Sequence, residues 1–193
     1  MKLKIEVLSH YLFEEKCKED GLNDENVEDK KGKAFIDIIG TEECRKYYLM
    51  EEMQHYFSNF SNVLNLEFDD LSQDVEYDGH IFKAMTMEQA EKTVDFIEKM
   101  INDGVTYFRI CCRAGYSRSR AVAEFIYRLC NDKGIDIEYE DRNDYTTILN
   151  QGVLRRLNHA YWKKHKMNGY ANGEDYEDDL KNPELREIHL YER

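Results

Sequence analysis

The sequence predicts an α/β domain with a central, mostly parallel sheet of about four to five strands flanked by helices. Two observations support this fold class. Four short apolar runs have the length and composition of buried strands, and segments with helical spacing separate them. Strands that alternate with helices are typical of parallel sheets, because each helix carries the chain back to the same end of the sheet. The four runs cover residues 4–8, 34–39, 63–68 and 105–111.

Helical spacing recurs in four segments, where apolar residues lie three or four positions apart. The second of these segments has a defined start. The Thr86 hydroxyl can accept a hydrogen bond from the amide of Gln89, while the Gln89 side chain can accept one from the amide of Thr86. The last segment carries several Lys and Arg residues, and we interpret it as an amphipathic surface helix rather than a contact for RNA or an acidic partner. The expected helices cover residues 42–57, 86–101, 118–130 and 152–166.

Composition and charge exclude several classes of protein. The chain has 193 residues, of which 41% are hydrophobic, and this suits one domain with a core. Its formal net charge of −13 argues against nucleic acid as a partner and against an anionic membrane surface. No apolar run approaches the roughly 20 residues of a membrane span, and the N-terminus lacks the apolar stretch of a secretory signal. We therefore expect a cytoplasmic protein, and a monomer.

The cysteines and the acidic stretches complete this picture. Five cysteines without a C-x-x-C pair give little support for a disulfide framework or a zinc site, so reduced thiols and no metal are expected. Residues 1–167 are predicted to form the folded domain, and residues 168–193 an acidic C-terminal tail or extension. The acidic stretches 14–29 and 174–179 are interpreted as solvated surface loop or tail.

The segment after the fourth apolar run carries the strongest chemical signal. Cys112 ends this strand, and a helix is expected to begin six residues later. In α/β folds, ligands bind at the carboxyl ends of the strands. The amides of residues 113–118 can turn toward one point, Gly115 allows a positive φ, and the helix N-terminus adds partial positive charge. Such a loop suits an anion with three or four oxygens.

Two side chains at this loop suit the chemistry of a bound anion. Arg118 can donate two hydrogen bonds to the anion from its guanidinium group. The same positive field favours the thiolate form of Cys112, because it stabilises an ionised sulfur. A thiolate below an anion-binding loop suits in-line attack on the phosphorus of a phosphate monoester, which gives a phosphocysteine intermediate.

This segment resembles the signature of the cysteine-dependent phosphatases, the superfamily of the protein tyrosine and dual-specificity phosphatases. That signature is Cys, five residues, Arg, then Ser or Thr, with Gly three residues after the Cys. This chain has Cys112, Gly115, Arg118 and Ser119 in those places. The run from Ala114 to Ser119 is most similar to the small dual-specificity enzymes. The resemblance implies a protein tyrosine phosphatase-like fold over roughly residues 4–166 and catalysis without a cofactor.

The resemblance also implies a role for each residue of the segment. Cys112 would be the nucleophile, Arg118 would hold the phosphate, and Ser119 would hydrogen-bond the sulfur and help it leave the phosphoenzyme. Independently of the resemblance, if the loop amides point inward, Arg113 and Tyr116 point toward the mouth of the loop and would touch the substrate; the alternative is plain surface exposure. The phosphate-binding residues would be Arg113, Ala114, Gly115, Tyr116, Ser117 and Arg118.

A general acid is the remaining requirement, because protonation of an alkoxide leaving group is worth about 10²–10⁴ in rate. In the family an Asp after the preceding strand supplies this proton. Asp70 matches that position best, with Asp69 and Asp78 as alternatives; Asp74 lies in the same loop. Asn150 resembles a family Asn that braces the phosphate loop, and it could equally be an ordinary helix cap.

The chain departs from the family at Cys111, because the family usually has His directly before the nucleophile. That His helps to activate the thiol, so its replacement leaves the degree of activation open. Cys111 could form a vicinal disulfide with Cys112 under oxidation, or be a small buried strand residue. The acid loop also lacks the usual proline.

The sequence thus favours a phosphatase for phosphotyrosine, or for phosphoserine and phosphothreonine as well, in a protein or peptide substrate. Phosphate, sulfate or vanadate is expected to occupy the site as an anion. One alternative is a phosphate-recognition module that binds without turnover. Another is a phosphatase for a non-protein phosphate, such as an RNA 5′ end or a phosphoinositide.

Overall fold

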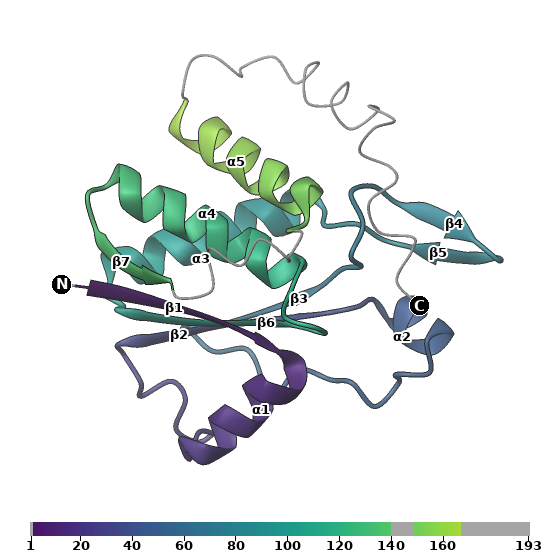
Figure 1. The fold of residues 1–193 in the computed structure, drawn as a ribbon, viewed down its shortest axis with the longest axis horizontal. Coiled ribbons are helices and arrows are strands. Elements are labelled where there is room, and N and C mark those ends of the chain that lie inside the picture. Colours follow the sequence, from purple (N-terminus) through teal and green to yellow (C-terminus); the bar gives the residue numbers. More distant parts are fainter. Residues whose placement is uncertain (1, 140–148, 167–193) are drawn as a thin grey trace.

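Strands and helices alternate along most of the chain in the computed structural model, which describes residues 2–139 and 149–166 (Figure 1). The elements are β1 (Lys2–Ser9), α1 (His10–Glu19), β2 (Lys33–Ile39), α2 (Glu42–Tyr47), β3 (Val63–Glu67), β4 (Val75–Tyr77), β5 (His80–Phe82), α3 (Met87–Asn102), β6 (Tyr107–Cys112), α4 (Arg118–Asp132), β7 (Asp136–Tyr139) and α5 (Gln151–His165). The proposed tail, residues 168–193, lies outside the described residues, so the division into domain and tail stays a prediction.

Five strands in the described part of the chain form one sheet, in the order β3-β2-β6-β1-β7, and every pairing is parallel. The prediction of a mostly parallel sheet of four to five strands flanked by helices is therefore confirmed. β6 lies in the middle of the sheet, where its last residue, Cys112, stands opposite Ser9 of β1 and Ile38 of β2. The segment singled out by the sequence thus follows the carboxyl end of the central strand.

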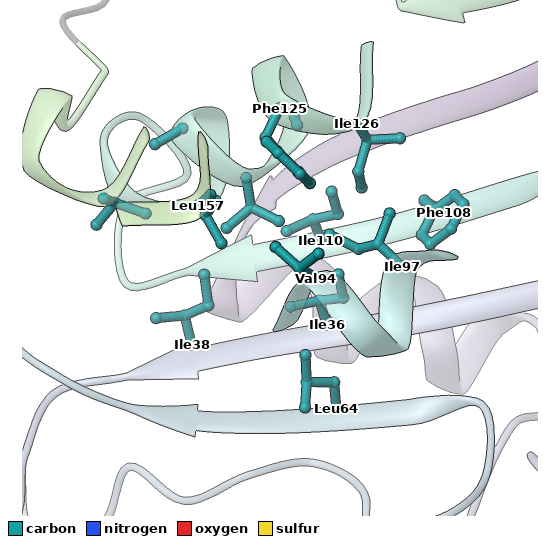
Figure 2. Close-up of a cluster of buried hydrophobic side chains, with 14 of the residues drawn as sticks. Ile36, Ile38, Leu64, Val94, Ile97, Phe108, Ile110, Phe125, Ile126 and Leu157 are labelled. Atoms are coloured by element: carbon teal, nitrogen blue, oxygen red, sulfur yellow. The ribbon is translucent and has the colours of Figure 1, made fainter. Parts of the chain in front are cut away.

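Helices cover both faces of the sheet, with α1 on one face and α3, α4 and α5 on the other (Figure 1). The larger core lies between the sheet and the three helices. Figure 2 shows Ile36 and Ile110 of the sheet in one cluster with Val94 and Ile97 of α3 and with Phe125 of α4. Because side chains alternate across a strand, the central strands bury residues on both faces.

A smaller core lies under α1. Phe13 of α1 packs against Phe35 of β2 and Phe57, with ring centroids 6.3 and 6.1 Å away and edge-to-face angles. Cys17, Leu22 and Val27 are also buried. The interpretation of residues 14–29 as solvated surface was therefore wrong for this part of the chain. Among the charged residues of this stretch are three apolar side chains that pack into the core and fix α1 and the loop after it to the sheet.

The starts of the helices follow the local sequence closely. The capping box of α3 is confirmed, since Thr86 accepts from the amide of Gln89 and the Gln89 side chain accepts from the amide of Thr86. The expected helix over residues 42–57 is wrong in length, because α2 ends at Tyr47. Leu49 adopts a φ of +55°, and the Met50 amide donates to the carbonyl of Arg45 at 2.7 Å, which ends the helix.

The apolar spacing in residues 42–57 has a different origin from a single helix. Tyr47 packs on Phe82 of β5, with ring centroids 5.3 Å apart. Phe57 belongs to the core under α1 instead. β4 and β5 form a hairpin that the sequence analysis did not predict, with Asp78 and Gly79 at its turn, both at positive φ. None of the helices in the described ranges combines the length and apolar composition needed to cross a membrane.

Candidate active site

The loop between β6 and α4, residues 113–117, lies against the end of β1. Gly115 has a φ of +78°, and a Cβ atom there would lie 2.7 Å from the carbonyl carbon of Leu8 and from the amide nitrogen of Ser9. Such a contact is closer than carbon atoms can approach, so glycine is required for both its conformation and its size. The close approach fixes the loop at the carboxyl edge of the sheet.

The loop is held through its carbonyl groups. The carbonyl of Arg113 accepts from the amide of His10, and the carbonyl of Ser117 accepts from the amide of Asn150, each at 3.3 Å. In contrast, the six consecutive N–H groups of residues 113–118 donate to no acceptor in the described part of the chain. Consecutive unpaired N–H groups at a helix N-terminus are an arrangement that binds anions.

The first turn of α4 also lacks a side-chain cap. Ser9, Thr41, Thr86 and Asn150 each accept a hydrogen bond from the first turn of the helix that they precede. Ser117, at the corresponding place before α4, makes no such bond. Its hydroxyl donates to Asp70 instead. The N–H groups at the positive end of α4 are therefore not bound by the side chain before the helix, and a negative group there would be stabilised.

Cys112 and Ser119 lie together below the loop. The Cys112 Sγ and the Ser119 Oγ are 3.0 Å apart, which is a hydrogen bond in which either atom can donate. Cys112 is 2% exposed and Ser119 is fully buried. The two side chains therefore lie within hydrogen-bond distance of each other, but the sulfur is covered rather than open to solvent.

Arg118 points inward, toward the end of β3. Its Nη1 donates to the carbonyl of Phe68 at 2.6 Å, and the side chain is 5% exposed. Its Nε has no hydrogen-bond partner in the described residues. A buried donor of a charged group is costly when it is unpaired, so this N–H would gain from an acceptor such as a ligand oxygen.

Of the candidate acids, Asp70 contacts the loop. Its Oδ1 accepts from the Ser117 hydroxyl and from the Asn150 side-chain amide, both at 2.7 Å. Asp69 is buried and accepts from the amides of Thr41 and Lys83, so it fastens α2 and β5 to the end of β3.

The other two acids lie in the hairpin region. Asp74 accepts from the side chain of Lys83 and from the amide of Ala84. Asp78 is exposed and occupies the turn between β4 and β5. The structure therefore brings Asp70 to the loop and gives the other candidates contacts elsewhere.

Asn150 combines both functions that the sequence allowed. Its Oδ1 accepts from the amide of Val153 and caps α5, while its Nδ2 donates to Asp70. Gly152 lets α5 approach closely, because a Cβ there would lie 2.6 Å from the Cα of Ser72. Asn150 thus joins the acid segment, the loop and the start of α5.

Cys111 faces the opposite side of the sheet from Cys112. Its thiol donates to the Oδ1 of Asp37 at 3.1 Å, and the two cysteines belong to different core clusters. Burial raises the pKa of the Cys111 thiol well above its usual value, and the negative charge of Asp37 raises it further. The structure favours Cys111 as a buried strand residue over a partner in a vicinal disulfide.

A buried cluster under the start of the loop was not found from the sequence. The carboxylate of Asp37 lies 3.3 Å from His55 Nδ1 and 3.7 Å from His10 Nε2, and accepts from the amide of Tyr56. Burial raises the pKa of Asp37, but the two histidines outweigh this effect and hold it below its usual value. No local signal marks these residues, because three separate segments supply them.

Two loop side chains lie at the surface. Arg113 stacks over the ring of Tyr48, with its guanidinium carbon 5.9 Å from the ring centroid. Tyr116 is 58% exposed. Both side chains are exposed to solvent next to the loop.

The basic side chains of α5 are used within the fold. Lys163 pairs with Glu91 and Lys164 with Asp95, at 2.6 and 2.5 Å. These pairs join α5 to α3, so the structure favours the interpretation of a packed amphipathic helix. In the described ranges, no group of three or more His, Cys, Asp and Glu side chains is arranged to hold a metal ion.

Comparisons with known proteins show a distant likeness to a solved structure. No family model matches the sequence, and no curated protein matches it. Among solved structures, the chain is similar to a human tyrosine phosphatase-like serine/threonine/tyrosine-interacting protein. The two share 19% identity at a TM-score of 0.38, over 72% of this chain and 83% of that one. A likeness at this distance carries no information about activity.

Proposed function

We propose that this protein is a cysteine-dependent phosphatase that hydrolyses phosphate monoesters on proteins, above all phosphotyrosine. One observation carries the proposal. Cys112 and Ser119 lie 3.0 Å apart below a loop whose six N–H groups, residues 113–118, have no acceptor in the described ranges. A sulfur nucleophile and an anion-binding loop at one place are what phosphoryl transfer through cysteine requires.

Binding would use the groups that lack partners. The oxygens of the phosphate would accept from the loop N–H groups and from the Nε of Arg118, and the N-terminus of α4 would stabilise their charge. Since Arg118 is already fixed by its bond to the carbonyl of Phe68, it would lose little freedom on binding.

The reaction would proceed in two steps. The Cys112 thiolate attacks phosphorus while the bond to the leaving oxygen breaks, and Asp70 gives its proton to that oxygen. Water then attacks the phosphocysteine, Asp70 takes the proton of the water, and sulfur leaves as thiolate with a hydrogen bond from Ser119. The contact between Asp70 and Ser117 supports this assignment, because it ties the acid to the loop.

The test is turnover of p-nitrophenyl phosphate by the full chain in the presence of a metal chelator. We expect activity that vanadate inhibits and that Cys112→Ser abolishes. Cys44→Ser is the matched control, because Cys44 is also a free cysteine but is half-buried and lies in α2. Turnover that survives in Cys112→Ser, or that requires an added metal, would contradict the proposal.

A second function is favoured by the burial of Cys112, which is 2% exposed. With the sulfur covered, the loop could bind phosphate without turnover, as a recognition module. Titration with a phosphotyrosine peptide and with its unphosphorylated form separates the two functions. Tight phosphate-dependent binding of the peptide without release of inorganic phosphate would favour the module.

A further inference from the structure

Seven large hydrophobic side chains are exposed in the described residues. The large hydrophobic residues that are exposed in the described ranges all belong to the loop or to segments after the sheet strands. Three of them, Tyr11, Leu12 and Tyr116, lie on α1 and the loop. The other four are Tyr48 and Leu49 at the end of α2, and Tyr77 and Ile81 on the hairpin. Grouped exposed apolar side chains mark interaction surfaces in many proteins.

The α2 and hairpin side chains form a continuous surface that begins at the loop. Arg113 stacks on Tyr48 at 5.9 Å, Tyr48 contacts Tyr47 at 5.0 Å, and Tyr47 contacts Tyr77 at 6.2 Å. These three steps correspond to at most about five residues of an extended peptide. Figure 1 shows α2 beside the hairpin β4–β5, at the edge of the sheet where the strands end. We call this surface the aromatic ridge: Tyr47, Tyr48, Leu49, Tyr77, His80 and Ile81.

The hairpin does not need all of these side chains to fold onto α2. Phe82 faces inward, is 7% exposed and packs on Tyr47. Tyr77 and Ile81 are 60% and 50% exposed. Their apolar surface is therefore available to a partner.

Apart from Arg113, which stacks on Tyr48 at the loop end, the charges around the aromatic ridge are mainly negative. Lys46 pairs with Glu42 and Lys83 pairs with Asp74, so these lysines are neutralised. Four exposed carboxylates have no ion-pair partner in the described part of the chain: Glu51, Glu52, Glu76 and Asp78. A partner that matches this surface carries apolar side chains for the ridge and Lys or Arg for its margins.

We infer that the aromatic ridge is a docking surface for the substrate, a phosphorylated polypeptide with apolar and basic residues next to its phosphorylated residue. This inference rests on the proposed function, because it joins the ridge to the phosphate site through Arg113. Tyrosine side chains also stack on nucleic-acid bases, but the carboxylates around the ridge repel a phosphate backbone.

The test compares three phosphotyrosine peptides with five residues on each side of the phosphotyrosine. One has Leu, Phe, Lys and Arg flanks, the second replaces the basic residues with Asp and Glu, and the third replaces the apolar residues with Ser and Gly. The readout is kcat/KM of each peptide divided by kcat/KM of p-nitrophenyl phosphate, which is too small to reach the ridge. We expect the first peptide to exceed each of the others about tenfold.

Variants assign this preference to the ridge. The double variant Tyr77→Ser/Ile81→Ser should lower the ratio for the first peptide about tenfold, because both apolar contacts are lost. Glu76→Lys should lower the ratio for the first peptide, relative to the ratio for the acidic peptide, about two- to fivefold. Leu12→Ser is the matched control, an exposed apolar residue on α1, and should leave the ratio unchanged. A thermal unfolding scan of each variant shows that the fold is kept.

The outcomes separate the inference from the proposed function. Equal ratios for the three peptides, with p-nitrophenyl phosphate turned over, would overturn the ridge and leave the phosphatase standing. If nothing is turned over, the proposal of a phosphatase fails. The affinities of the same three peptides, measured by fluorescence anisotropy, then test the ridge: the first peptide should bind more tightly than the other two, and equal affinities would overturn the inference. A 5′-phosphorylated RNA that loses affinity in the double variant would overturn the inference. So would a dimer in light scattering that this variant dissociates, if the peptide ratios do not change.

Discussion

The hydroxyl of Ser119 lies 3.0 Å from the sulfur of Cys112, and the proposed mechanism uses this contact when sulfur leaves phosphorus. A hydrogen bond to a charged group is worth about 1.5–3 kcal/mol, so we expect Ser119→Ala to lower kcat about 10- to 100-fold. Stopped-flow measurement with p-nitrophenyl phosphate should show a burst followed by slow turnover. Ser119→Thr, which keeps the hydroxyl, should restore much of the rate. Equal kcat for Ser119→Ala and the natural protein would remove this role.

Variants of Asp70 and Asp78 provide a matched test of which residue is the general acid. Asp70→Asn keeps the acceptor oxygen that Ser117 and Asn150 bind but removes the proton. We expect it to slow hydrolysis of an alkyl phosphate about 10²–10⁴-fold, and that of p-nitrophenyl phosphate much less, because nitrophenolate leaves without protonation. Asp78→Asn should behave like the natural protein, since Asn suits the positive φ of the hairpin turn. A greater loss in Asp78→Asn would reassign the acid.

At the scale of elements, the contact between the loop and β1 depends on Gly115. Gly21 is the matched control, since it also has a positive φ but has open space around it. We expect Gly21→Ala to cost about 1 kcal/mol of unfolding free energy through its backbone alone. Gly115→Ala should cost more, at least about 2 kcal/mol, because its Cβ would press on the β1 backbone. Urea unfolding measures both, and similar losses would show that the loop can move away from β1 freely.

The helix predicted over residues 42–57 is longer than the helix that forms there. In residues 42–57, apolar side chains lie at helical spacing, yet α2 ends at Tyr47. Tyr47 and Phe57 serve two different cores, one at the hairpin and one under α1. A short-range pattern cannot distinguish one apolar face from two separate contacts, because both give the same spacing.

For the molecule as a whole, the cluster of Asp37 and His10 links stability to pH. Burial lowers the pKa of His10, but the contact with Asp37 and the charge of Glu14 outweigh it, so the pKa is raised above 6.5. Protonated His10 therefore stabilises the fold below about pH 6.5, and this contribution is lost as the pH rises through the raised pKa. Asp37, with its lowered pKa, stabilises the fold above pH 3.8, and that contribution is lost as the pH falls.

Urea unfolding at pH 5.5 and 8.5 tests the histidine part of this linkage. Between pH 5.5 and pH 8.5, we expect the free energy of unfolding to fall by on the order of 1 kcal/mol more in the natural protein than in the His10→Asn variant. Asn can still donate to the carbonyl of Gln54, the hydrogen-bond partner of His10. The same pH dependence in both proteins would show that His10 does not titrate between the two pH values.

The sequence by itself determined the parallel sheet, the capping box of α3, and the loop from Cys112 to Ser119. Each depends on residues close together in the chain: an apolar run, a pair three residues apart, or a glycine between a strand and a helix. Which Asp meets the loop was decided by tertiary structure alone. Asp70 is 47 residues from Ser117 and 80 from Asn150, so the packing of β3 and α5 around α4 brings them together. The buried cluster of Asp37 likewise joins separate segments, because only the folded sheet aligns their ends.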